Sequence, residues 1–89
     1  MPIISQFYGI VISMHFRETE GKHHLSHMHI RYNEYKAVYD FDANMIEGKM
    51  PLKQRKLIEA WILIHKEELE SLWKLIQEEN KFFKIPPLK

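Results

Sequence analysis

The histidines are the residues of this sequence most able to do chemistry, and four of the six lie close together: His23, His24, His27 and His29. On a β-strand, His27 and His29 would point to the same side, with their Cα atoms about 6–7 Å apart. An imidazole can bind a metal ion, and it can also accept or donate a proton near neutral pH. The cluster therefore predicts either a metal site or an acid–base site.

The metal hypothesis takes His27 and His29 as two ligands and His23 as the third, a place that His24, His15, Asp40 or Glu47 could also fill. The chain has no cysteine, so nitrogen and oxygen donors would have to supply the whole site. Such a set of donors suits Zn²⁺ or another first-row divalent ion. A His-x-His pair on a strand also occurs in many proteins that bind no metal, so the spacing does not decide between a metal site and another role.

The catalytic hypothesis combines the same strand with its charged neighbours. His27 or His29 would transfer a proton, and a carboxylate from Asp40 or Glu47 would orient the imidazole. Arg17 or Arg31 would neutralise charge on a phosphate group. Together these side chains would suit the cleavage of a phosphodiester bond, as in RNA. The third interpretation is that they form a solvated polar face, or a patch that binds a partner protein.

Length and composition are typical of a small single-domain protein. The chain has 89 residues, 45% of them hydrophobic, and a formal net charge of +1, so it can build a core and carries no global field that would attract nucleic acid. We expect one domain over residues 1–89, with residues 81–89 as an extended tail that is either frayed or held by Phe82 and Phe83. The N-terminal residues do not resemble a signal peptide or a membrane span, which predicts a cytoplasmic protein without membrane contact.

Alternation of apolar and polar residues predicts four β-strands, over residues 7–17, 27–33, 35–41 and 45–48. A helical region over residues 51–80 follows, because no Gly or Pro occurs from Leu52 to Asn80 and the apolar residues recur every three or four positions. It is either one bent helix or two helices with a break near residues 64–66, and His65 in its apolar stripe is interpreted as a packed or hydrogen-bonded histidine. Since only this region is long enough to cover the apolar face of the sheet, the sequence predicts an α+β fold whose other sheet face stays open.

The second and third strands are expected to form a hairpin around Asn33-Glu34, because asparagine tolerates the positive φ that a two-residue turn needs. The apolar face then pairs Tyr32 with Tyr35, Ile30 with Ala37 and Met28 with Tyr39, and the polar face pairs Arg31 with Lys36, His29 with Val38 and His27 with Asp40. A slip by one residue would mix the two faces, which favours this register. The Arg31–Lys36 pair counts mildly against it, since like charges that face each other repel.

A second turn, at Ala43-Asn44, is expected to join the third and fourth strands. It would pair Phe41 with Ile46 on the core face and Asp40 with Glu47 on the polar face. These two carboxylates would repel each other unless a cation lay between them, and His27 is the nearest candidate. The open face would then carry the side chains of Ser13, His15, Arg17, His27, His29, Arg31, Asp40 and Glu47.

Several pieces of the sequence together resemble the DUF4160 family, a bacterial domain of unknown function. They are Phe7-Tyr8-Gly9-Ile10, the H-x-x-x-H-x-H pattern of His23, His27 and His29, Glu47-Gly48 followed by Pro51, and His65-x-Glu67-Glu68-Leu69. The resemblance covers residues 2–85. One departure is His24-Leu25-Ser26, where family members usually carry Asn-Pro-Pro. The two prolines that would restrict the backbone of this loop are therefore missing.

Members of this family are small cytoplasmic proteins, often encoded beside a protein of the DUF2442 type. The arrangement implies a toxin–antitoxin-like pair. Our leading expectation is therefore that the chain is one component of such a pair, works with a small protein partner encoded nearby, and acts on RNA through the sheet face that carries His27, His29, Asp40 and Glu47. A divalent-metal-binding protein that uses His23, His27 and His29 and a non-catalytic protein-binding module are the alternatives, and a homo-oligomer stays open.

Overall fold

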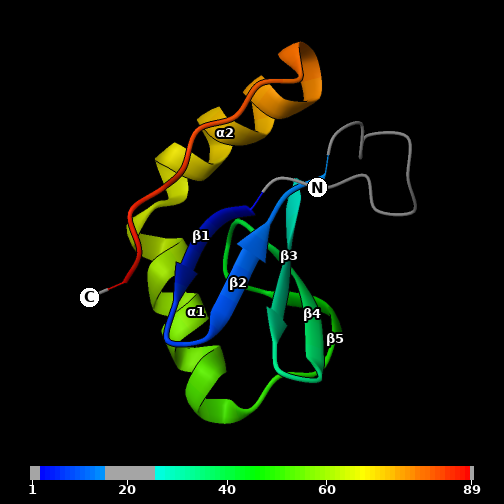
Figure 1. Ribbon diagram of the computed structural model, residues 1–89, viewed down its shortest axis with the longest axis vertical. Coiled ribbons are helices and arrows are strands. Elements are labelled where there is room, and N and C mark those ends of the chain that lie inside the picture. The colour runs from blue at the N-terminus through cyan, green and yellow to red at the C-terminus, as the bar shows by residue number, and fades with distance from the viewer. Residues whose placement is uncertain (1–2, 16–25, 89) are drawn as a thin grey trace.

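The computed structural model describes residues 3–15 and 26–88, and it shows a β-sheet followed by two helices (Figure 1). The sheet is antiparallel, and its five strands follow the order β1-β2-β3-β4-β5. The strands are β1 (Ile3–Phe7), β2 (Ile10–Ser13), β3 (His27–Tyr32), β4 (Tyr35–Asp40) and β5 (Met45–Gly48), and the helices are α1 (Leu52–Ile64) and α2 (Lys66–Glu79). The predicted α+β fold is confirmed, with one strand more than the sequence pattern indicated.

The prediction of one long strand over residues 7–17 is wrong, because the chain turns back at Tyr8-Gly9 and forms the hairpin of β1 and β2. Tyr8 and Gly9 both have positive φ, 50° and 79°, as a two-residue turn with the twist of a sheet requires. Alternation of apolar and polar residues runs through this turn without a break, so Gly9 alone marked it in the sequence. Residues 16 and 17 lie outside the described residues.

The central hairpin of β3 and β4 is confirmed in its turn and in its register. All six predicted pairs between residues 27–32 and 35–40 are present. Asn33 has a φ of 51°, the conformation for which asparagine was expected at this turn. Because the register decides the face on which each side chain lies, it puts His29 and Arg31 together on the polar face of the sheet.

The predicted pairs between the third and fourth predicted strands are wrong. The sequence predicted Phe41 opposite Ile46 and Asp40 opposite Glu47. The structure instead pairs Val38 with Glu47, and the register between β4 and β5 shifts at a bulge immediately after Val38. Glu47 therefore lies opposite a residue two positions nearer the start of β4 than predicted, away from Asp40.

The cause is the turn that begins at Asp40, because the chain uses this carboxylate itself. Its Oδ1 accepts hydrogen bonds from the backbone N–H groups of Asp42 and Asn44, each at 2.9 Å, and its Oδ2 accepts one from the side-chain amide of Asn44 at 3.1 Å. Ala43 takes a φ of 65° in this turn. A side chain that binds the backbone a few residues further on competes with strand pairing, so the turn takes up residues that the prediction had assigned to the ladder.

Gly48 ends β5 at a position that suits glycine alone. Its φ is 96°, and a Cβ atom placed there would lie 2.2 Å from the carbonyl oxygen of Lys36 and 2.7 Å from the Cα of Ala37. The backbone N–H of Lys49 donates to the same carbonyl oxygen at 2.9 Å. The absence of a side chain therefore lets β5 close onto β4 and brings Lys49 next to Lys36.

Both helices pack on one face of the sheet (Figure 1), so the prediction that the helical region covers the apolar face is confirmed. The core includes Ile4, Ile10, Ile12, Met28, Ile30 and Tyr39 from the sheet and Ile58, Trp61, Ile62, Leu69, Leu72 and Ile76 from the helices. The helical region divides at His65, which has a φ of −108°, within the segment where a break was expected. Neither helix is long and apolar enough to cross a membrane.

Tyr39 joins the sheet to α1 through a partly buried hydrogen bond at the border of the core. Its side chain is fully buried, and its hydroxyl donates to Glu59 Oε2 at 3.1 Å. Burial and the neighbouring carboxylate both disfavour the phenolate, which raises the pKa of Tyr39 to about 12. The tyrosine therefore remains a neutral hydrogen-bond donor throughout the neutral and mildly alkaline range.

The C-terminal tail packs beside β1, but not through the residues expected. Ile85 is buried, and its N–H donates to a carbonyl oxygen of β1 at 2.9 Å. The indole N–H of Trp61 donates to the carbonyl oxygen of Pro86, also at 2.9 Å. Phe82 and Phe83 are exposed, so Ile85 and not the phenylalanines anchors the tail. The tail runs back along α2 toward α1 (Figure 1).

Candidate functional site

A hollow with a volume of about 440 Å³ lies on the sheet face that the helices leave open. We call it the sheet hollow. Strands β1 to β5 all contribute to it, and its polar side chains are Ser13, His15, His29, Arg31, Lys36 and Glu47. Apolar side chains of Ile3, Val11 and Val38 lie among them. The strand register explains this gathering, because alternate residues of paired strands share one face.

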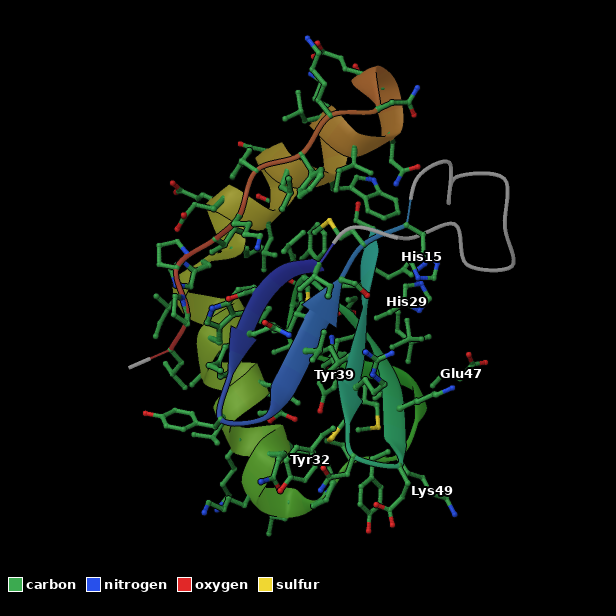
Figure 2. All side chains as sticks on the ribbon, in the orientation of Figure 1. His15, His29, Tyr32, Tyr39, Glu47 and Lys49 are labelled. Atoms are coloured by element: carbon green, nitrogen blue, oxygen red, sulfur yellow. The ribbon has the colours of Figure 1, made fainter. Side chains whose placement is uncertain are left out.

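His15 and His29 form a stacked pair in the sheet hollow, which we call the histidine stack. Their ring centroids are 3.8 Å apart and the ring planes differ by 8°. Figure 2 shows both side chains beside each other and pointing away from the helices. The carbonyl oxygen of His15 accepts a hydrogen bond from the side-chain amide of Gln77 at 2.8 Å, so α2 holds the segment immediately after β2, where this histidine lies.

His27 takes a different position from the one the sequence predicted. It is only 1% exposed and does not line the sheet hollow. Its ring contacts Trp73 of α2 at a centroid distance of 5.3 Å and meets the ring of His29 at 5.4 Å, nearly edge-on. His27 therefore packs against His29 from the protein side, where it can fix the ring of His29 but cannot reach a ligand in the hollow.

Arg31 and Lys36 lie directly opposite each other on β3 and β4 and both line the sheet hollow. Lys49 follows next to Lys36, as its backbone hydrogen bond shows. We call these three residues the basic row. None of them forms an ion pair within residues 3–15 and 26–88. Facing like charges cost stability in a sheet, so a bound anion would relieve a repulsion that the folded chain otherwise retains.

Glu47 borders the sheet hollow on the β5 side (Figure 2). Since His29 pairs with Val38 and Val38 pairs with Glu47, the backbones of His29 and Glu47 are two strand spacings apart, about 10 Å. The predicted partnership of Glu47 with Asp40 is absent, because all three hydrogen bonds of the Asp40 carboxylate hold the turn after β4. Glu47 thus places a negative charge at one border of an otherwise basic hollow.

The metal hypothesis stays a prediction, because His23 lies outside the described residues. Within the part of the chain that the structure describes, no three histidine or carboxylate side chains are placed to hold one ion. A zinc ion lies in the plane of each imidazole that binds it, about 2.0–2.1 Å from the nitrogen. The rings of His15 and His29 are instead stacked in nearly parallel planes, with their centroids 3.8 Å apart, so one ion cannot lie in both ring planes. The histidine stack would have to open before both rings could bind the same ion.

The remaining described histidine, His65, is structural, as its position in the apolar stripe suggested. Its Nδ1 lies 2.6 Å from Glu68 Oε1, and its ring packs on Trp61 at a centroid distance of 5.3 Å. These contacts hold the junction of α1 and α2. The next residue, Lys66, pairs with Asp42 of the turn after β4, and this pair raises the pKa of the exposed Lys66 ammonium.

The sequence profile of DUF4160, described as a domain of unknown function, matches residues 9–74. The chain belongs to the DUF4160 family. The matched range contains β2 to β5, α1 and most of α2, and it includes every polar side chain that lines the sheet hollow. No curated protein and no solved structure matches the chain. Membership in DUF4160 therefore identifies the domain without naming an activity.

Some residues of the sheet hollow in this DUF4160 domain were predicted from the sequence as functional residues, and one was not. His29, Arg31 and Glu47 were predicted from strand register, and the structure brings all three to the sheet hollow. Lys36 was missed as a functional residue, although its position opposite Arg31 was predicted. The signal was the like-charge pair itself, which is a defect of the register when only stability is considered and a possible anion site when ligand binding is considered.

Proposed function

We propose that this DUF4160 protein acts on RNA through the sheet hollow, as one member of a bacterial toxin–antitoxin-like protein pair that works in the cytoplasm. One observation carries the RNA part. The hollow combines two cations that face each other, Arg31 and Lys36, with two imidazoles, His15 and His29. The cations suit a phosphate group, and imidazoles are the side chains that most readily transfer protons at neutral pH.

Each polar residue of the hollow has a role that follows from its position. Arg31 and Lys36 bind the phosphate, with Arg31 able to make two parallel hydrogen bonds to its oxygens. His29 lies two residues from Arg31 on the same strand face, about 6.6 Å along β3, and transfers a proton to or from the reacting oxygens. His15 stacks on His29 and holds its ring. Glu47 repels phosphate from the β5 border and so confines the backbone of the ligand to the basic side.

The partnership with a second protein rests on the family resemblance, in which members are often encoded beside a DUF2442-type protein. In a pair of this kind, the partner would block the sheet hollow until it is removed. The proposal therefore predicts that expression of this chain alone arrests bacterial growth and that co-expression of the neighbouring protein restores it. His29→Gln should abolish the arrest while the variant accumulates to the wild-type level.

The direct test is cleavage of an end-labelled RNA by the purified chain, followed on a denaturing gel. We expect the wild type to cleave, and His29→Gln to lose about 100-fold or more in rate, the usual contribution of a general acid or base. Arg31→Gln should weaken binding of the RNA. Lys56→Gln removes an exposed cation from α1, on the other side of the molecule from the hollow, and should change neither value.

Two outcomes would contradict the proposal. A folded wild-type protein that neither binds nor cleaves RNA would remove its basis. Cleavage that His29→Gln leaves unchanged would show that the activity belongs to a contaminating nuclease or to another part of the chain. Thermal unfolding of each variant, followed by circular dichroism, separates loss of the site from loss of the fold.

A further inference from the structure

Helix α1 exposes apolar side chains on the face that points away from the sheet, where a surface helix usually carries polar ones. Leu52, Leu63 and Ile64 are 63%, 62% and 65% exposed, more than any other large hydrophobic side chain within residues 3–15 and 26–88. Helical periodicity puts them in one row with the exposed Lys56 and Ala60, opposite the buried residues of α1. We call these five residues the α1 outer face. Exposed hydrophobic residues that are scattered singly need no explanation, but three in one row indicate an interaction surface.

Charges of opposite sign lie at the two ends of the α1 outer face. Lys53 follows Leu52 at the start of α1, and Glu67 lies in the first turn of α2, three residues after Ile64. Both are exposed, and neither forms an ion pair within the described part of the chain. A second copy laid antiparallel would bring the basic end of one face over the acidic end of the other, whereas a parallel copy would put the lysines side by side. The face is therefore complementary to itself in one orientation.

We infer that two copies of this chain associate through the α1 outer face, with the helices antiparallel around a two-fold axis at the middle of the face. This register lays Leu52 on Ile64 of the second copy. It also lays Lys56 on Ala60 of the second copy, whose small side chain leaves room for the aliphatic part of the lysine while the ammonium group stays in water. The oppositely charged ends then meet twice, once on each side of the axis.

The size and place of this interface decide how the dimer behaves. A contact confined to one 13-residue helix from each copy belongs at the small end of protein interfaces, at or below about 1,200 Å². We therefore expect reversible association with a Kd of about 10–100 µM. Both helices pack on the face of the sheet opposite the sheet hollow (Figure 1), so both hollows stay open in the dimer. The inference is thus independent of the proposed action on RNA.

Sedimentation equilibrium of the full-length protein, without RNA, tests the association between about 2 and 500 µM, a range that spans the expected Kd. We expect mostly monomer at the lowest concentration and mostly dimer at the highest. Leu63→Gln/Ile64→Gln should weaken the dimer at least about tenfold, because it removes apolar surface from both halves of the interface. Phe82→Gln/Phe83→Gln is the matched control, since it makes the same kind of change at exposed positions of the tail, and it should leave the Kd unchanged. Circular dichroism confirms that each variant is folded.

Lys53→Glu and Glu67→Lys test the orientation of the two helices. Each should weaken the dimer about fivefold at low salt, because it replaces two opposite-charge contacts with two like-charge contacts. Both substitutions in one chain should restore the wild-type Kd, since the contact is antiparallel and symmetric. A folded wild type that stays monomeric at the highest concentration would overturn the inference and leave the proposed action on RNA in place. A Kd that Leu63→Gln/Ile64→Gln leaves unchanged would also overturn it, and single charge variants that the double variant does not rescue would overturn the antiparallel arrangement.

Discussion

Replacing Lys36 with glutamate should separate the stability of the central hairpin from the binding of an anion. Lys36 lies between two cations in the folded chain. Arg31 is directly opposite on β3, and Lys49 donates its backbone N–H to the carbonyl oxygen of Lys36 on the other side. All three residues are exposed. Lys36→Glu turns two like-charge contacts into two opposite-charge contacts, so we expect the variant to be more stable than the wild type.

The size of the gain follows from the geometry of these contacts. An opposite-charge pair across two strands contributes about 0.2–1 kcal/mol, and a like-charge pair is destabilising. Because exposed charges are well solvated, each contact belongs in the lower half of that range, and reversing both should raise the free energy of unfolding by about 1 kcal/mol. In a domain of this size the melting temperature should rise by about 4–8 °C.

Urea unfolding followed by circular dichroism measures the change, at low salt and in 1 M NaCl. Most of the gain should disappear in 1 M NaCl, where the Debye length is about 3 Å. Lys84→Glu is the matched control, because it makes the same change in net charge at an exposed position of the tail, and it should shift the free energy of unfolding by less than about 0.5 kcal/mol. A double-mutant cycle with Arg31→Gln then isolates the contribution of the Arg31 contact.

The same substitution should weaken binding of RNA at least about fivefold, because one phosphate contact is lost and a negative charge replaces it. Two results would refute the reasoning. A destabilised Lys36→Glu protein would show that the basic row is not repulsive in the folded chain. A stabilised protein that still binds RNA as tightly as the wild type would show that Lys36 does not meet the ligand.

Three further predictions concern the fold. Gly48→Ala should cost about 3 kcal/mol in urea unfolding, since a Cβ there meets the backbone of β4 in a strained conformation. At Gly9 the φ is also positive, but a Cβ would meet only a side chain, at 3.4 Å, so Gly9→Ala should cost about 1–2 kcal/mol. Equal costs would contradict this steric explanation. Folding raises the pKa of Tyr39 from 10.0 to about 12, so the stabilising effect of its neutral hydroxyl is complete below pH 10 and is lost as the pH rises to 12. The stability advantage of the wild type over Tyr39→Phe should therefore shrink between pH 10 and pH 12. Ile85→Ala should lower the free energy of unfolding by about 2–3 kcal/mol because Ile85 is buried. Phe83→Ala should change it by less than about 0.5 kcal/mol. The reverse order would mean that the phenylalanines anchor the tail.

The parts of the fold that the sequence predicts correctly are those decided by neighbouring residues. The β3–β4 hairpin could be predicted because alternation and the turn preference of Asn33 agree within a short stretch. The β1–β2 hairpin could not, since the same alternation passes through Tyr8-Gly9 without a break. The turn after β4 was misjudged for another reason: the carboxylate of Asp40 captures two backbone N–H groups, and a hydrophobic pattern carries no information about such a capture.

The candidate site shows the same division between local and distant causes. His29 and Arg31 could be placed on the open face from the register of one hairpin. His27 has the same position in the alternation as His29, yet it is buried because Trp73 packs against its ring. Trp73 lies on α2, far along the chain, and nothing in the strand indicates which helical residue will pass over it. Burial of this kind depends on how two layers of the fold meet, and one strand read alone cannot predict it.

The like-charge pair and the histidine stack are best explained together. A hairpin adjusted for stability alone would place an acid opposite Arg31, where the chain has Lys36. Departures from local preference tend to occur at functional sites, and this one opens into the same hollow as the stacked rings of His15 and His29. Binding of a phosphate requires only the two cations, whereas cleavage also requires an imidazole. Arg31→Gln should therefore fail at binding, and His29→Gln should bind RNA and leave it intact; if both variants fail at the same step, the cations and the histidines do not serve one ligand.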